Sequence, residues 1–236
     1  MARIHCPMAL PVGETLALPE GPARHVQVLR MQPGMTLCLF NGQGGQHLAR
    51  IERMGRSEVR VQVLAHEPVE REAARPIHLL AGLTANERMD WLVEKATELG
   101  AASLTPVLLS RSVMRLQGER AERRQQHWQA VAVAACEQCG RNRVPLIHPV
   151  VSLSQALDGV PQGEARCILT LQSPARTLAQ VRSASGPLWV LSGPEGGFDP
   201  AEEQRALQAG FEPLSLGIRV LRAETAPLAL LAACLL

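Results

Sequence analysis

The spacing of apolar and polar residues changes close to residue 70 of this chain. Before that point apolar residues alternate with polar ones, as in Val59–Val63, and the apolar run Leu37–Phe40 precedes the turn dipeptide Asn41-Gly42. A period of two, interrupted by turns, is typical of strands with one buried face. We therefore predict a small β-barrel over residues 1–70, with the domain boundary in the charged segment Glu70–Pro76.

Apolar runs and helical spacings alternate from Ile77 onward. Buried strands are predicted at Ile77–Leu83, Leu104–Leu109, Arg166–Leu171, Pro187–Leu191 and Phe211–Leu216, and helices at Met89–Leu99 and Glu119–Cys139. A further helix begins at Asp199-Pro200, where an N-cap residue precedes proline, and Thr84 and Glu87 have the spacing of a capping box. This alternation predicts an α/β domain with a mostly parallel sheet over residues 71–236.

The composition is that of an ordinary globular protein, since 46% of the residues are hydrophobic and 19% are charged. Residues 1–150 hold 18 Lys and Arg against 14 Asp and Glu, so this part is the more favourable face for a polyanion. A solvated surface of mixed charge explains the same excess. Lys95 is the only lysine, and arginine suits phosphate contacts, although a GC-rich coding sequence also produces this bias.

The sequence lacks the motifs of several common binding sites. The chain has no G-x-G-x-x-G, and Lys95 follows glutamate, which excludes a phosphate-binding P-loop. Cys136 and Cys139 form a lone C-x-x-C without the second pair that a zinc site needs, so we predict packing and no metal. The apolar tail Ala226–Leu236 is shorter than the roughly 20 residues that span a bilayer, and no signal peptide is visible. We expect a cytoplasmic protein without a membrane segment.

Two glycine-containing loops near the C-terminus each follow a predicted strand. They are Gly193–Phe198 and Leu216–Ala226. Glycine lets the backbone approach a ligand closely, and parallel sheets bind ligands at their strand ends, so we predict a ligand site across the two loops. In the second loop Arg222 either pairs with Glu224 or faces the ligand at the start of the last helix. We favour the second alternative because the glycine turn and the helix N-terminus converge there.

These two loops resemble the late motifs of the SPOUT, or trefoil-knot, methyltransferases. Three further stretches, His25–Gly34, Met89–Gly100 and Ala135–Pro145, are similar to the RsmE family within that superfamily. The resemblance covers nearly the whole chain in the same order. It implies an α/β fold with an N-terminal PUA-like β-barrel (residues 1–70, RNA binding) and a SPOUT-type domain (residues 71–236) with a deep C-terminal trefoil knot.

The resemblance also implies an activity: methyl transfer from S-adenosyl-L-methionine to N3 of a uridine in 16S ribosomal RNA of the small ribosomal subunit, by a homodimer. Carried over onto this sequence, the cofactor pocket comprises Leu171, Ser192, Gly193, Pro194, Glu195, Gly196, Gly197, Leu216, Gly217, Ile218, Val220, Leu221, Arg222 and Ala226. The predicted RNA contacts are Arg3, His25, Arg30, Arg88, Arg111, Gln138, Arg141 and Asn142.

Two residues are our candidates for catalysis. Arg222 would stabilise the negative charge that develops on the uracil carbonyls. Glu195 is either the base that removes the N3 proton or an acceptor that holds its loop through backbone N–H groups. The family has a basic residue and glycine where this chain has Ala85-Asn86, so one expected RNA contact is missing, and Arg88 is the candidate to replace it.

Two other functions remain open on the sequence. The chain could be an RNA-binding assembly factor that keeps the fold without catalysis, which the intact glycine loops argue against. It could also be a knotted methyltransferase that acts on tRNA, which the barrel and the stretch Cys136–Arg143 argue against. Cofactor binding tests the first alternative, and mapping of the methylated RNA tests the second.

Overall fold

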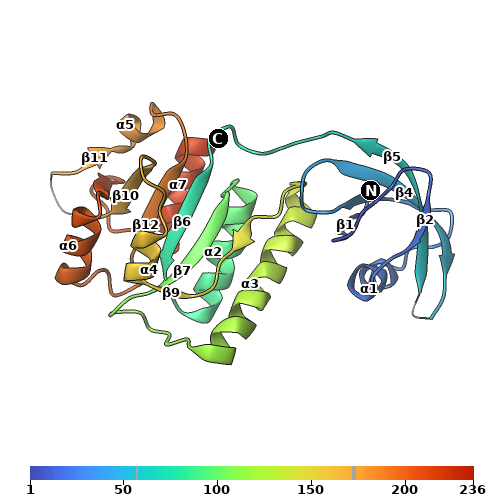
Figure 1. The fold of residues 1–236 in the computed structure, drawn as a ribbon, viewed down its shortest axis with the longest axis horizontal. Coiled ribbons are helices and arrows are strands. Elements are labelled where there is room, and N and C mark those ends of the chain that lie inside the picture. Colours follow the sequence, from blue (N-terminus) through green and yellow to red (C-terminus); the bar gives the residue numbers. More distant parts are fainter. Residues whose placement is uncertain (57, 172–173) are drawn as a thin grey trace. The chain divides into compact units, whose positions relative to one another are not determined.

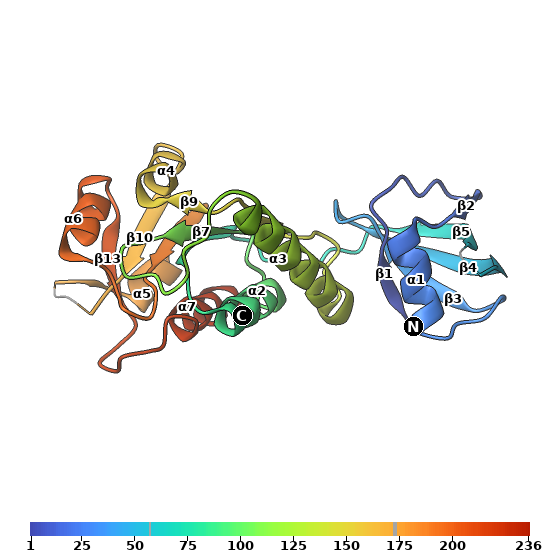
Figure 2. The ribbon, with the colours of Figure 1, turned by 90° about the horizontal axis from the view of Figure 1, so that it is seen from below.

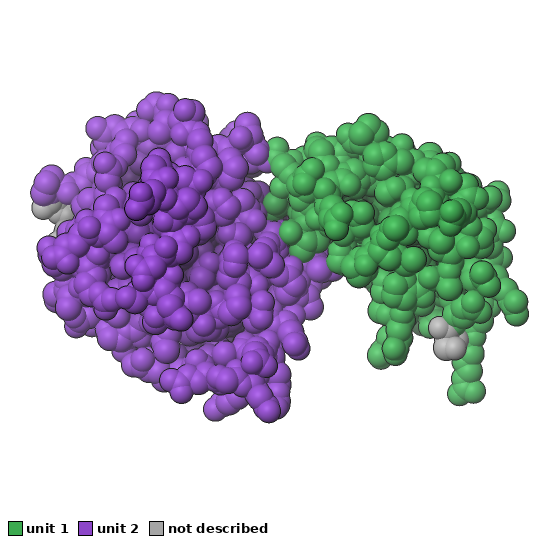
Figure 3. All heavy atoms as spheres, viewed as in Figure 1, with its two compact units in different colours: residues 1–72, 136–144 green, residues 73–135, 145–236 purple. Residues whose placement is uncertain are grey.

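The structure is a computed structural model that describes residues 1–56, 58–171 and 174–236. The chain divides into two compact units, which Figure 3 colours separately. The first unit contains residues 1–72 and 136–144, and the second contains residues 73–135 and 145–236. The segment 136–144 thus belongs to the first unit although the chain on both sides of it belongs to the second. No change of pattern in the sequence indicates that the segment 136–144 packs with the first unit.

The first unit is built on a mixed five-stranded sheet with the order β1-β3-β4-β5-β2. Its elements are β1 (Arg3–His5), β2 (Thr15–Ala17), α1 (Glu20–Val28), β3 (Thr36–Phe40), β4 (Gln46–Met54) and β5 (Val59–Glu67). β1 runs parallel to β3, and the other neighbours are antiparallel. In β5 the side chains of Val59, Val61 and Val63 are fully buried whereas Arg60 is exposed. The alternation in the sequence therefore marks the core face of this sheet.

The second unit contains an entirely parallel sheet with the order β11-β13-β10-β12-β6-β7-β8, and β9 also pairs with β7 (Figure 1). The strands are β6 (Ile77–Gly82), β7 (Ser103–Leu108), β8 (Leu146–Ile147), β9 (Val151–Ser152), β10 (Ala165–Leu169), β11 (Arg176–Thr177), β12 (Leu188–Ser192) and β13 (Glu212–Ser215). Each of the five strands expected from an apolar run is present. The central strands are buried on both faces, which explains why their sequences are continuously apolar.

Helices cover both faces of this sheet. They are α2 (Asn86–Glu98), α3 (Gly118–Cys139), α4 (Leu153–Asp158), α5 (Leu178–Arg182), α6 (Pro200–Gln208) and α7 (Thr225–Leu235). Figure 2 shows α4 and α6 on one face and α2 and α7 on the other. On the first face Leu80, Ile168 and Leu191 of the central strands pack with Ala206 and Phe211 in one apolar cluster. Among the described residues no helix is long and apolar enough to cross a membrane.

The starts of α6 and α2 differ in how they are capped. At α6 the Asp199 carboxylate accepts a hydrogen bond from the Ala201 N–H at 2.9 Å, and Glu202 accepts one from the Asp199 N–H at 3.0 Å, which confirms the predicted N-cap. The capping box predicted for α2 is wrong. The N-cap is Ala85, and the N–H of Ala85 donates at 2.8 Å to Glu195 Oε1, a residue 110 positions away. A carboxylate from the first glycine loop therefore takes the place of a local cap.

A cavity at the strand ends of the second unit

The carboxyl ends of β10, β12 and β13 open into a cavity of about 580 Å³, a size typical of small-molecule sites. The first glycine loop follows β12 and the second follows β13, and both line the cavity. The strands that carry the two loops are not neighbours, because β10 lies between them. The end of β10 contributes Leu169, Thr170 and Leu171 to the wall. The ligand site expected from the two loops is thus a single cavity with three strand ends.

Most of the residues carried over for the cofactor pocket line this cavity. They are Leu171, Ser192, Gly193, Pro194, Glu195, Gly197, Leu216, Gly217, Val220, Leu221, Arg222 and Ala226. Gly196 and Ile218 do not line it. Gly196 is packed on Arg111, where a Cβ atom would come within 2.9 Å of the Arg111 Cβ, and the Ile218 side chain is 98% exposed.

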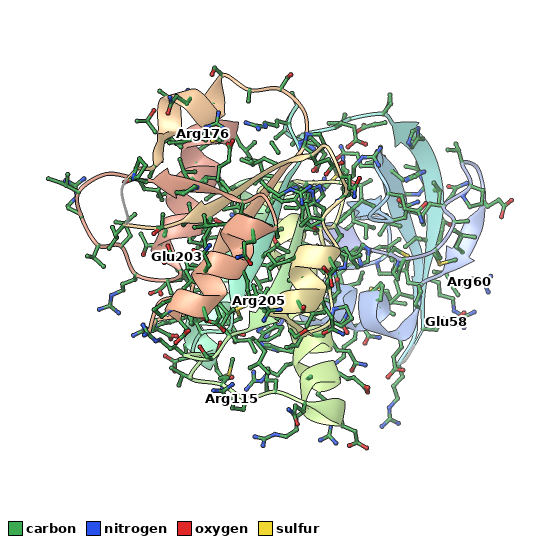
Figure 4. The ribbon with its side chains drawn as sticks, turned by 60° about the vertical axis from the view of Figure 1, so that its left-hand side comes forward. Glu58, Arg60, Arg115, Arg176, Glu203 and Arg205 are labelled. Atoms are coloured by element: carbon green, nitrogen blue, oxygen red, sulfur yellow. The ribbon has the colours of Figure 1, made fainter. Side chains whose placement is uncertain are left out.

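Several lining residues were not expected from the sequence. Arg88, assigned above to RNA, borders the cavity, and so do Leu169, Thr170, Phe198, Glu203, Leu214, Arg219 and Ala223. The Thr170 hydroxyl donates at 2.7 Å to Glu203 Oε1, which joins the end of β10 to α6 (Figure 4). Glu203 looks like an ordinary first-turn acid in the sequence, so only the fold reveals that it faces the cavity.

Close backbone contact fixes the first loop against β6. At Gly82, the last residue of β6, a Cβ atom would lie 2.6 Å from the Pro194 nitrogen. Gly197 has φ +68°, a conformation that favours glycine. The glycines of this region therefore serve both the turn and the packing of the loop on its neighbouring strand.

The buried carboxylate of Glu224 and the partly buried carboxylate of Glu195 share one guanidinium beside the cavity. Arg88 Nη1 lies 3.3 Å from Glu195 Oε1, and Arg88 Nε lies 4.0 Å from Glu224 Oε1. The other oxygen of each carboxylate, Oε2, is buried and has no hydrogen-bond partner among the described residues. The expected alternative of an ion pair between Glu224 and a neighbouring arginine is therefore not realised, because Glu224 faces Arg88 instead.

Arg222 is exposed and lines the cavity just before α7. Its carbonyl oxygen accepts hydrogen bonds from the N–H groups of Thr225 and Ala226, at 2.9 and 3.0 Å. In the described part of the chain its guanidinium has no protein partner. The positive end of the α7 dipole adds to its charge, so this corner of the cavity favours an anionic or electron-rich group.

Three of the predicted RNA contacts are bonded within the first unit. Arg141 is buried and pairs with Glu72 through Nε to Oε1 at 3.0 Å and Nη2 to Oε2 at 2.5 Å. Asn142 is fully buried, accepts from Arg3 Nη2 at 2.7 Å and donates to the Val69 carbonyl at 2.5 Å. These bonds hold the segment 136–144 on the first unit, and they occupy donors that an RNA contact would need.

The other predicted RNA contacts are more accessible. His25 Nδ1 lies 3.4 Å from Glu137 Oε1, and Gln138 is exposed. Arg30 is exposed with φ +55°, a left-handed conformation that is uncommon for a residue with a side chain. In the second unit Arg111 is exposed and donates to the Gly196 carbonyl at 3.1 Å.

The C-x-x-C stretch forms the end of α3. Cys136 is buried, and burial raises the pKa of its thiol to about 12, which leaves it protonated and unreactive at neutral pH. Among the described residues no group of three His, Cys, Asp or Glu side chains is arranged to hold a metal ion.

Comparison with known proteins identifies the class to which this fold and cavity belong. A family model described as an RNA methyltransferase domain matches residues 71–235, and one described as an RNA methyltransferase PUA domain matches residues 19–64. The chain is 30% identical to the ribosomal RNA small subunit methyltransferase E of Synechocystis, over 92% of this chain and 72% of that one. It is 28% identical to the protein of the same name from Bacillus subtilis, over 88% and 84%.

A solved structure indicates the same family. The ribosomal RNA small subunit methyltransferase E of Neisseria gonorrhoeae, solved with bound S-adenosyl methionine, is 38% identical, with a TM-score of 0.93 over 99% of this chain and 96% of that one. The chain therefore belongs to the ribosomal RNA small subunit methyltransferase E family. The resemblance found in the sequence is confirmed at this level, including the PUA-like N-terminal domain and the α/β domain.

Proposed function

We propose that this protein transfers a methyl group from S-adenosylmethionine to N3 of a uridine in 16S ribosomal RNA of the small ribosomal subunit. The observation that carries this proposal is the cavity between the two glycine loops, in a chain 38% identical to a relative that binds S-adenosyl methionine. Its lining suits that cofactor, because apolar residues such as Leu171 and Leu216 face it together with backbone from the glycine loops.

The cofactor would supply an activated methyl group on a sulfonium, so the protein needs no covalent intermediate. The chain's own residues would align the uracil ring and exclude water. Arg222, just before α7, would stabilise negative charge on the uracil carbonyls. Of the two roles that we considered for Glu195, the contact of Oε1 with the Ala85 N–H at 2.8 Å supports the holding of the loop, whereas Oε2 is buried and would have to become accessible to accept the N3 proton.

Several further properties belong to the same proposal. The partner is ribosomal RNA within the small subunit, which would locate the protein in the cytoplasm. We also propose a homodimer and a C-terminal trefoil knot, as the family resemblance implies. The apolar helix α7 supports an interface, because several of its side chains are only partly buried by its own unit. Light scattering on the purified protein tests the dimer.

The activity is tested by mass spectrometry of ribosomal RNA nucleosides from a deletion strain, with and without the restored gene. We expect N3-methyluridine to disappear from 16S RNA in the deletion strain and to return with the gene. Persistence of the nucleoside in the deletion strain contradicts the proposal. Loss of a methyl group from tRNA instead supports the tRNA alternative, and failure of the purified protein to bind S-adenosylmethionine supports the assembly factor without catalysis.

A further inference from the structure

The second unit has another hollow, of about 550 Å³, that the proposed chemistry does not use. The arginine basin, as we call it, is lined by Arg115, Arg120, Arg123, Arg124, His127 and Asn86. The basic residues come from the first three turns of α3 and from the loop before it, which carries Arg115, labelled in Figure 4. None of the described residues that line the basin is acidic. Such a concentration of one sign of charge attracts an anion.

The partners of these side chains show which of them are available. Arg123 pairs with Glu119 at 2.6 Å, Arg115 donates to the Ser110 carbonyl at 2.7 Å, and His127 bonds Asp90. By contrast, Arg120 and Arg124 have no ion pair and no hydrogen bond to any described residue.

Arg120 and Arg124 are also neighbours on one face of α3, since they are four positions apart. Two like charges at this spacing destabilise a helix slightly when nothing neutralises them. Each guanidinium keeps all five N–H donors for a ligand and can bind a phosphate through two of them. This pair is therefore the part of the basin that is best placed to hold an anion.

Two short segments connect the basin to the cavity. At the start of α2, Asn86 lines the basin and Arg88 lines the cavity. In the loop after β7, Arg111 is packed on Gly196 of the first glycine loop, and Arg115 lines the basin. Each of these two segments of the second unit therefore contributes residues both to the basin and to the cavity or its first glycine loop. Among anions, an RNA strand that enters the cavity is therefore the ligand that these shared segments favour for the basin.

We propose that the arginine basin binds the sugar-phosphate backbone of the ribosomal RNA strand that flanks the target base. This inference rests on the proposed function and adds a binding surface that none of the predicted RNA contacts includes. Phosphate contacts orient a strand without reading its bases. The basin therefore contributes to affinity for the RNA and not to the methyl-transfer step.

The test compares the double variant Arg120→Gln/Arg124→Gln with the wild type and with a control that removes the same charge elsewhere. The control is Arg182→Gln/Arg205→Gln; these two arginines, on α5 and α6, do not themselves line either hollow. Small ribosomal subunits from the deletion strain serve as substrate, and 16S RNA serves as ligand in a direct binding assay. Cofactor affinity by calorimetry reports whether each variant is folded.

We expect the basin variant to raise KM for the subunit on the order of tenfold, with kcat and cofactor affinity unchanged. The slope of log K against log salt should fall by roughly 0.7–0.9 for each lost phosphate contact. Arg120→Lys/Arg124→Lys, which keeps the charge, should recover most of that slope. Should the double variant not fold, the two single substitutions should each give part of the effect.

Equal KM values and salt slopes for the basin variant and the control overturn the proposal. A loss of kcat at unchanged KM also overturns it, because the basin would then act on the chemical step. If the basin variant raises KM for subunits but binds free 16S RNA as the wild type does, the basin binds a ribosomal protein instead, and the proposal fails. A wild type that binds 16S RNA through the basin but methylates nothing refutes the proposed function alone, since the direct binding assay does not depend on catalysis.

Discussion

Replacing Arg88 removes the guanidinium that faces the largely buried carboxylates of both Glu195 and Glu224. The side chains of Glu195 and Glu224 are 18% and 11% exposed, whereas Arg88 itself is 38% exposed. Breaking a fully buried ion pair destabilises a protein by about 3–5 kcal/mol, and an exposed pair is worth about 1 kcal/mol or less. The Arg88 cluster lies between these limits, because its carboxylates are largely buried and its guanidinium is partly exposed to water. We expect Arg88→Gln to lower the free energy of unfolding of the second unit by roughly 2 kcal/mol.

The chain offers a matched control in Arg176, which is 39% exposed and pairs with Glu212 (Figure 4). Because Glu212 is 55% exposed, water can solvate it after the partner is lost, and Arg176→Gln should cost about 0.5 kcal/mol. The measurement is equilibrium urea unfolding followed by tryptophan fluorescence. All three tryptophans, Trp91, Trp128 and Trp189, belong to the second unit, so the signal reports that unit.

A second substitution tests the cause of the destabilisation. Removing one of the two carboxylate charges with Glu224→Gln should recover about half of the loss in the Arg88→Gln background, because less uncompensated charge remains buried. Equal losses for Arg88→Gln and Arg176→Gln would refute the argument from carboxylate burial. So would a double variant that is no more stable than Arg88→Gln alone.

Three further predictions concern the cavity, the cysteines and the histidines. Arg222→Ala should reduce tritium transfer from labelled cofactor by about 10²–10³-fold with little change in cofactor affinity by calorimetry; comparable losses in both would make Arg222 a cofactor-pocket residue. At pH 8 Cys139, which is partly exposed, should react with a thiol reagent well before Cys136, whose thiolate fraction is about 10⁻⁴; mass mapping that finds Cys136 modified first contradicts its burial. Burial lowers the pKa of His78, so the unfolded chain binds more protons and stability should fall as the pH drops below about 6.5; His78→Gln should reduce that fall, and an unchanged pH profile would exclude His78 as its source.

The sequence predicts those elements whose signals are local. Asp199, Pro200 and Glu202 mark the start of α6 because an N-cap depends on residues within one turn. The start of α2 could not be found in this way, since its N–H group is held by Glu195 from a distant loop. The strands of two residues are also too short to show a pattern, and pairing with neighbouring strands defines them.

For the candidate site, too, the sequence predicts features with local signals and misses those that depend on distant residues. Glycine after a buried strand is a local signal, and it located both loops of the cavity. Strand order is a property of the whole sheet, so the position of β10 between β12 and β13 was not visible. Thr170 and Glu203 were missed for that reason, although they are hydrogen bonded at 2.7 Å beside the cavity. Arg141 appeared to be a free basic residue because its partner Glu72 is 69 positions away.

Residues 136–144 are part of the first unit although the chain on both sides of them is part of the second, and this sets an order for folding during translation. Domains generally fold as the ribosome releases them, with the N-terminal one first. Here residues 1–72 emerge without Arg141 and Asn142, so Glu72 and Arg3 lack the partners they have in the folded unit. The first unit can be completed only after the ribosome has released residue 144, when α3 has also been synthesised. The N-terminal unit is therefore not an independent early product of synthesis, and a fragment that ends at residue 72 lacks part of its own interior.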